Sequence, residues 1–94
     1  MFKWLMYKNK TPLEFYNIVG YNKRDKQHYL CRASNSDAMY FDDNAKELDI
    51  MNFSNRDMAQ AWLDNEDNQE ILHVQDIVET RIEWIRVDVK GVLV

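Results

Sequence analysis

A basic and aromatic cluster between residues 21 and 32 is the part of this sequence whose residue types are best suited to recognition. It combines side chains that neutralise phosphates with rings that stack on bases: Tyr21, Lys23, Arg24, Lys26, His28, Tyr29 and Arg32. Proteins bind single-stranded nucleic acid through this combination. A nucleic-acid-binding module is therefore one hypothesis. The interpretation we favour is that the cations keep an exposed turn soluble while the tyrosines pair across neighbouring strands.

A second candidate for chemistry is a thiol with an imidazole base. Cys31 is the only cysteine, and His28 and His73 are the only histidines. On a strand, however, His28 and Cys31 are three residues apart and would leave opposite faces. The sequence also lacks a phosphate-binding loop, a Gly-x-Ser-x-Gly elbow and a His-Glu-x-x-His pair. We therefore predict no catalytic residues, and a thiol-dependent enzyme ranks third among the functional hypotheses.

Acidic residues in the middle of the chain suggest cation binding, but their spacing argues against it. A calcium-binding EF-hand loop needs glycine at its sixth position. Counting from Asp64 that position holds Gln69, and counting from Asp42 it holds Glu47. A single cysteine excludes a disulfide within the chain and a zinc site built from cysteines. We predict no metal and no cofactor.

Charge is distributed unevenly along the chain. Residues 1–32 carry seven Lys/Arg and two Asp/Glu, whereas residues 33–80 carry two and twelve, within a net charge of −4. Complementary charge steers association with a partner, although a charged run is more often a solvated face. The sequence leaves open whether the two regions meet in the fold.

Two strands that form a hairpin are predicted near the N-terminus. Residues 13–21 are rich in aromatic and β-branched types, and residues 28–33 have the same character. The polar run between them lacks an Asn-Gly or Asp-Gly pair, so we expect a loop of about four or five residues with positive φ at Asn22 or Asp25. Residues 38–41 are predicted to form a further short strand.

A helix is predicted over residues 55–65, with Ser54 as its N-cap. Phe53 and Met58 are spaced as a hydrophobic staple around this cap. Trp62 lies on the apolar face of this helix, and we expect it to pack in the core against Trp84 or its strand neighbours. A tryptophan left exposed would mark an interface.

Residues 70–89 carry two competing patterns. Ile85, Val87 and Val89 alternate with charged residues as in a half-buried strand, whereas apolar residues from Ile71 to Ile85 also recur at spacings of three and four. We favour strands because β-branched residues lower helix propensity. The choice between strand and helix at residues 70–80 stays open.

The first residues of the chain are also apolar. Phe2, Trp4 and Met6 share one parity of an extended segment, and Leu5 and Tyr7 share the other. Both faces of such a segment would need cover, so Phe2, Trp4 and Met6 are the candidate protein-interface residues.

Together these patterns predict one α+β domain spanning residues 1–94. A mostly antiparallel sheet is expected from an N-terminal β-hairpin and C-terminal strands, with one short helix, 55–65, packed on one face. The apolar runs are too short for a membrane span, which needs about 20 residues, and no signal sequence is evident. We expect a cytoplasmic, non-enzymatic accessory or interaction domain, of bacterial or mobile-element origin, that binds a protein partner or itself.

Overall fold

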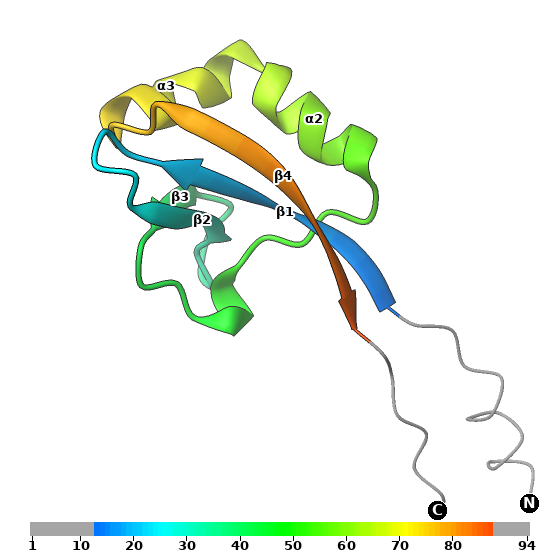
Figure 1. Ribbon diagram of the computed structural model, residues 1–94. Helices are drawn as coiled ribbons and strands as arrows, with labels where there is room; N and C mark the ends of the chain where they lie inside the picture. Colours follow the sequence, from blue (N-terminus) through cyan, green and yellow to red (C-terminus); the bar gives the residue numbers. More distant parts are fainter. Residues whose placement is uncertain (1–12, 88–94) are drawn as a thin grey trace, which may run out of the picture.

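The computed structural model describes residues 13–87, and Figure 1 shows its elements in chain order. They are β1 (Leu13–Tyr21), β2 (Gln27–Arg32), β3 (Met39–Asp42), the 3-10 helix η1 (Glu47–Asp49), α2 (Arg56–Asp64), α3 (Glu66–Val74) and β4 (Glu79–Val87). Phe2, Trp4 and Met6 lie outside the described residues. Within the described part, no helix is both long and apolar enough to cross a membrane.

The strands form one antiparallel sheet in the order β3-β2-β1-β4. β1 and β2 form the predicted hairpin, but their register covers only Val19 to Tyr21 opposite Tyr29 to Gln27. The longer partner of β1 is β4, which pairs with it along the whole strand, from Leu13 opposite Val87 to Tyr21 opposite Glu79. The α+β class and the antiparallel sheet are therefore confirmed.

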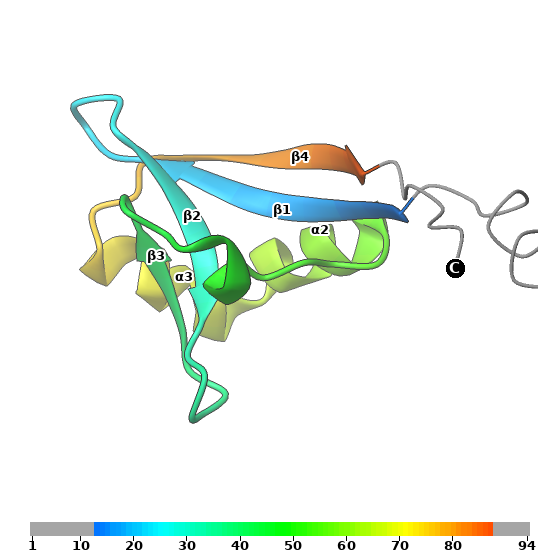
Figure 2. The same ribbon diagram turned by 90° about the horizontal axis from the view of Figure 1, so that it is seen from below.

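The sheet splits where β1 and β2 diverge (Figure 2). Residues 50–53 enter the gap between them: Met51 N donates to Leu30 O at 2.9 Å, and Phe53 N donates to Tyr16 O at 2.8 Å. Asn17 is 5% exposed and fixes this segment, because its Nδ2 donates to Met51 O at 3.0 Å and to Asn52 Oδ1 at 2.7 Å. The buried amide of Asn17 thus satisfies one backbone acceptor and one side-chain acceptor in residues 50–53, which are called the wedge below.

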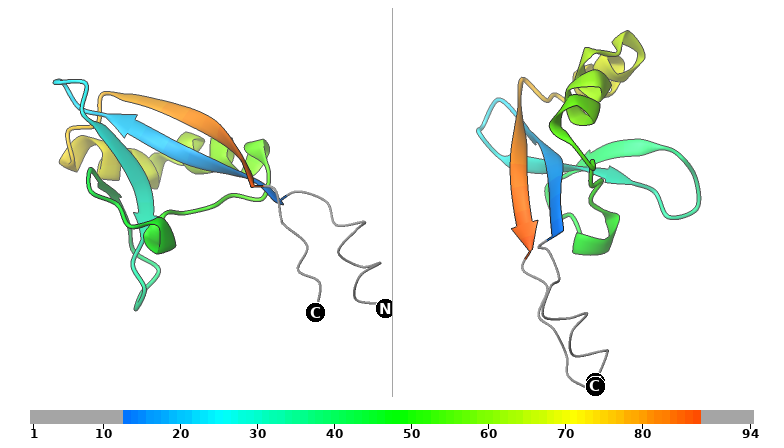
Figure 3. Two further views of the ribbon diagram at one scale, coloured as in Figure 1. Left: turned by 60° about the horizontal axis from the view of Figure 1, so that its bottom comes forward. Right: turned by 90° about the vertical axis from the view of Figure 1, so that its right-hand side faces the viewer.

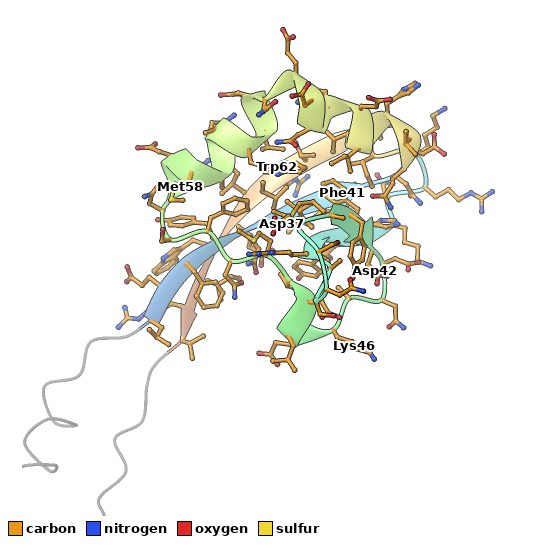
Figure 4. All side chains as sticks on the ribbon, turned by 180° about the vertical axis from the view of Figure 1, so that it is seen from behind. Asp37, Phe41, Asp42, Lys46, Met58 and Trp62 are labelled. Carbon is orange, nitrogen blue, oxygen red and sulfur yellow. The ribbon has the colours of Figure 1, made fainter. Side chains whose placement is uncertain are left out.

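Both helices cover one face of the sheet (Figure 3). The core joins Ile18, Leu30 and Phe41 of the strands to buried side chains that follow them in the chain: Phe53, Ala59, Leu72 and Ile77. Trp62 of α2 packs edge-on against Phe41, with ring centroids 6.2 Å apart, and Figure 4 shows the two side chains facing each other. Trp62 therefore packs against the core as predicted, with Ile82 of β4 in the same cluster, but Trp84 is not its partner and is 52% exposed.

The prediction of a single helix is wrong. The helix expected at 55–65 is α2, but its N-cap is Asn55, whose Oδ1 accepts from Met58 N at 2.9 Å, and not Ser54. A second helix, α3, begins directly afterwards, because Asn65 Oδ1 accepts from Asp67 N. The acidic first turn of α3 suits the positive end of the helix dipole. The strands favoured for residues 70–80 give way to helix up to Val74, and β4 begins only at Glu79.

Two turns in residues 13–87 need a residue with positive φ, and both place an aspartate there. Asp25 has φ of 59°, as predicted for the hairpin loop. Asn22 Oδ1 organises that loop by accepting from Arg24 N and Lys26 N, both at 2.9 Å. Asp76, with φ of 56°, ends the α3 region and leads the chain into β4. Aspartate tolerates this left-handed backbone better than most residues with a Cβ.

Candidate interaction surface

The basic hairpin is partly neutralised by carboxylates. Lys26 Nζ lies 2.7 Å from Asp43 Oδ2, and Arg32 pairs with Asp37 at 2.9 Å. The hydrogen bond and charge of Lys26 lower the pKa of Asp43 below its usual value. Basic and acidic regions of the sequence therefore meet in the fold at Lys26 and Asp43.

The rings of the hairpin are also engaged. Arg81 of β4 lies over the Tyr21 ring, 5.1 Å from its centroid, and His28 Nδ1 is 2.9 Å from Lys26 O. Within residues 13–87, Lys23 and Arg24 make no ion pair. The nucleic-acid hypothesis stays a prediction that rests mainly on these two exposed cations.

Cys31 does not share a site with a histidine. Cys31 is fully buried and its Sγ donates to Tyr29 O at 3.4 Å. His28 is on the sheet face opposite to Cys31, and His73 belongs to α3, which packs on that opposite face. Burial raises the pKa of the Cys31 thiol to about 11, with smaller contributions from Asp42 and Asp49. The group is a neutral thiol at physiological pH.

This environment predicts slow thiol chemistry. At about pH 8, we expect the native protein to react with a disulfide reagent about 100-fold more slowly than the urea-unfolded chain, because a raised pKa and burial both deplete accessible thiolate. Absorbance of the released thiol would follow the reaction. A stoichiometric burst from the native protein would contradict this prediction and revive a nucleophilic role for Cys31.

The two main hollows of residues 13–87 do not bring Cys31 to a histidine. The largest of those described, about 740 Å³, lies between the β2–β3 loop and residues 48–52, and its one basic side chain, Arg32, is held by Asp37. His73 lines a second hollow together with Asp64, Glu79 and Thr80, and Cys31 lines neither. Residues 13–87 hold no group of three or more His, Cys, Asp or Glu side chains that could bind a metal ion.

The two edges of the sheet differ in a way that bears on binding. At the β3 edge, Gln75 closes the backbone: Phe41 N donates to Gln75 Oε1 at 2.7 Å, and Gln75 Nε2 donates to Phe41 O at 2.9 Å. One side-chain amide therefore replaces the neighbouring strand that Phe41 lacks. Such closure is a known way of preventing a sheet from pairing with another chain.

The β4 edge carries no such closure in the described part of the chain. Among residues 13–87, only β1 hydrogen-bonds to the backbone of residues 79–85. Figure 2 shows β4 at the border of the molecule, with neither helix nor strand beyond its outer side. The strand also lacks proline, glycine and a bulge, which commonly protect edges.

Exposed apolar side chains surround the end of the β1–β4 ribbon, defined here as residues 13–16 and 84–87. Trp84 lies opposite Tyr16 on the helix-covered face, and Leu13 lies opposite Val87 on the other face. Leu13, Trp84 and Val87 are 58%, 52% and 44% exposed. The face with Leu13 and Val87 is apolar, since Phe15 and Ile85 complete it, whereas the face with Trp84 also carries Glu14 opposite Arg86. Contiguous exposed apolar residues of this kind mark interaction sites.

Sequence reasoning did not find this surface. The alternation from Ile85 onward predicts a strand, but a strand's position at the edge of a sheet depends on pairing with residues far away in sequence. The available signal was Trp84 itself, since a large apolar ring is costly to leave in water. Comparison of the chain with models of protein families, with curated proteins and with solved structures found no match.

Proposed function

We propose that this chain is a non-enzymatic protein-interaction domain that binds its partner along the β4 edge. The observation that carries this proposal is the difference between the two sheet edges, of which Gln75 closes one while β4 leaves the other accessible. Proteins commonly recognise an extended segment by adding it to such an edge, with main-chain hydrogen bonds for affinity and side chains for specificity.

Trp84 supplies the anchor of this surface. Its side chain lies on the edge strand and is half-exposed. Aromatic side chains that become buried on binding carry much of the binding energy of protein interfaces, so Trp84 is suited to this role. A partner strand beside β4 would cover part of the ring and replace water at the free backbone groups. The buried thiol, its separation from both histidines and the engaged charges of the hairpin support binding rather than catalysis.

The test is capture of a partner from an extract of the source cells with the immobilised full chain. We expect Trp84→Ala to lower the retained partner at least about tenfold, the loss typical of a hot-spot aromatic. Leu48→Ala is the matched control, because Leu48 is 98% exposed but lies on η1, away from β4. Exchange of the β4 backbone amides should slow in the complex. Equal capture by both variants, or protection confined to other strands, would exclude the β4 surface.

A further inference from the structure

Charged side chains of both signs alternate along β4. Glu79, Arg81 and Glu83 alternate with Thr80 and Ile82, so the three charged side chains share one face of the strand. Arg81 is held by Glu79 at 3.1 Å, and its guanidinium keeps further N–H donors for a second acceptor. Glu83 makes no ion pair with any residue between 13 and 87.

We propose, building on the proposed function, that the partner of β4 is β4 of a second copy, paired antiparallel about a two-fold axis through Ile82. A two-fold axis perpendicular to the sheet keeps each face continuous, so residues opposite one another must have the same parity. The symmetric registers are therefore those centred on a single residue, and each can be judged by the charges that it places opposite one another.

The register centred on Ile82 is the only one among those centred on residues 81 to 85 that pairs opposite charges. It places Arg81 opposite Glu83 of the second copy, and symmetry makes this pair twice. It also places Trp84 opposite Thr80 on the helix-covered face. Directly opposite charges on neighbouring strands stabilise the pairing, and like charges destabilise it.

The neighbouring registers are disfavoured or neutral. Centring on Arg81 opposes Arg81 to itself and Glu79 to Glu83, and centring on Glu83 opposes Glu83 to itself. Centring on Trp84 or Ile85 leaves no two charges opposite each other. Centring on Thr80 would also oppose Glu79 to Arg81, but it overlaps only residues 79–81 of the strand. Charge complementarity and strand overlap together favour the register centred on Ile82.

The paired edge would extend one sheet across two copies, as the two four-stranded sheets join through β4. The β3 edges, each closed by Gln75, would then be the outer borders of the assembly, so pairing stops at two copies. This explains why one edge is closed and the other is not: a sheet open at both edges would continue into a fibre.

A charge-reversal cycle tests the proposal with the full chain. Molar mass by light scattering over a concentration series should show a dimer for the natural chain. Arg81→Glu and Glu83→Arg should each weaken dimerisation at least about tenfold, because each creates two like-charge oppositions. The double reversal should restore the natural dissociation constant within about threefold. The double reversal places two carboxylates at residues 79 and 81 of the same chain, so it cannot restore the ion pair between them. Recovery of dimerisation would therefore report only the pair between residue 81 of one copy and residue 83 of the other.

Matched controls and the opposing outcomes complete the design. Arg56→Glu and Glu70→Arg change the net charge equally at exposed helix positions and should leave the dimer unchanged. Circular dichroism should show that every variant is folded. A monomeric natural chain, or a dimer unaffected by either single reversal, would overturn the proposal. If the chain is monomeric but still captures another protein through Trp84, self-pairing is wrong and the proposed function stands. If the chain neither dimerises nor captures a partner through Trp84, both the self-pairing and the proposed function are wrong.

Discussion

Replacing Gly20 by valine should destabilise the protein by about 3 kcal/mol or more, the upper range for inserting methyl groups into a packed core. A Cβ at this position would lie 2.7 Å from Ile77 Cγ2 and 3.0 Å from two carbons of the Phe41 ring. Gly20→Ala should cost about 1–3 kcal/mol, because overpacking outweighs the roughly 0.4–1 kcal/mol that alanine gains by restricting the unfolded chain. Urea denaturation followed by tryptophan fluorescence would measure both changes.

A second substitution separates this clash from other effects of losing glycine. Leucine has no branch at Cβ, so Ile77→Leu removes the atom that a Cβ at position 20 would meet while conserving side-chain volume. Alone, Ile77→Leu should cost less than about 1.5 kcal/mol. In combination it should recover much of the loss caused by Gly20→Ala. Simple additivity of the two changes would show that the contact with Ile77 does not limit residue 20.

Gly20 also shows how the sheet positions the proposed binding edge. Gly20 lies opposite Thr80 in the register of β1 with β4. The space that a Cβ at residue 20 would need is occupied by the side chain of Ile77, two residues before β4 begins. Ile77 N donates to Leu72 O, and Val78 N donates to Tyr21 O, so the chain is fixed between α3 and β1 as it enters β4. The glycine therefore allows α3 and the start of β4 to approach β1 closely.

Local patterns predicted much of the fold, because strand 13–21, the extended C-terminal segment and the first helix depend on short-range features. β-branched and aromatic content identifies these extended segments, and a polar N-cap followed by Met58, Ala61 and Trp62 identifies α2. The shift of the N-cap from Ser54 to Asn55 is small, since both residues suit the position. Local sequence also placed positive φ at Asp25 correctly.

The second helix was not predicted because the residue types of its second half favour a strand, whereas their spacing favours a helix. Ile71 and Val74 favour strands intrinsically, but α3 has Asn65 as its cap and buries Leu72 in the core, and tertiary packing outweighs weak propensities. The apolar spacing of three from Ile71 to Val74, the first step of the alternative helical pattern, was the correct signal. That spacing does not continue through β4, whose register with β1 is regular.

The candidate site could not be predicted because it depends on which strands lie at the edges. Closure of β3 joins Gln75 to Phe41 across 34 residues of sequence, and no local pattern indicates such a contact. Pairing of Lys26 with Asp43 likewise joins residues from two regions whose charge alone suggested separate partners. The exposure of Trp84 follows from the same long-range arrangement, since α2 packs Trp62 against β3 instead.

Asn17→Asp should destabilise the protein by about 3–5 kcal/mol near neutral pH, the cost typical of leaving a buried charge without a partner. The Asn17 amide donates to Met51 O and to Asn52 Oδ1, and a carboxylate would direct an oxygen toward these acceptors instead. The wedge of residues 50–53 would lose its side-chain attachment to β1 and would be held there only by the backbone hydrogen bonds between Phe53 and Tyr16. Asn17→Ala, which removes the donor without adding charge, should cost less, about 1–3 kcal/mol.

The pH dependence of the aspartate variant distinguishes buried charge from lost packing. Burial and the facing oxygens must raise the pKa of the introduced carboxyl in the folded state above its value in the unfolded chain. The folded variant then binds more protons, so its stability rises as the pH falls and is lost again as the pH rises through the raised folded pKa. A protonated carboxyl can also donate one hydrogen bond to Met51 O.

The difference in the free energy of unfolding between each variant and the natural chain is the measured quantity. Between about pH 7 and about pH 4, this difference should narrow for Asn17→Asp and stay constant for Asn17→Ala. A gap that widens on acidification, or that moves equally in both variants, would mean that the amide of residue 17 does not hold the wedge in the way its hydrogen bonds indicate.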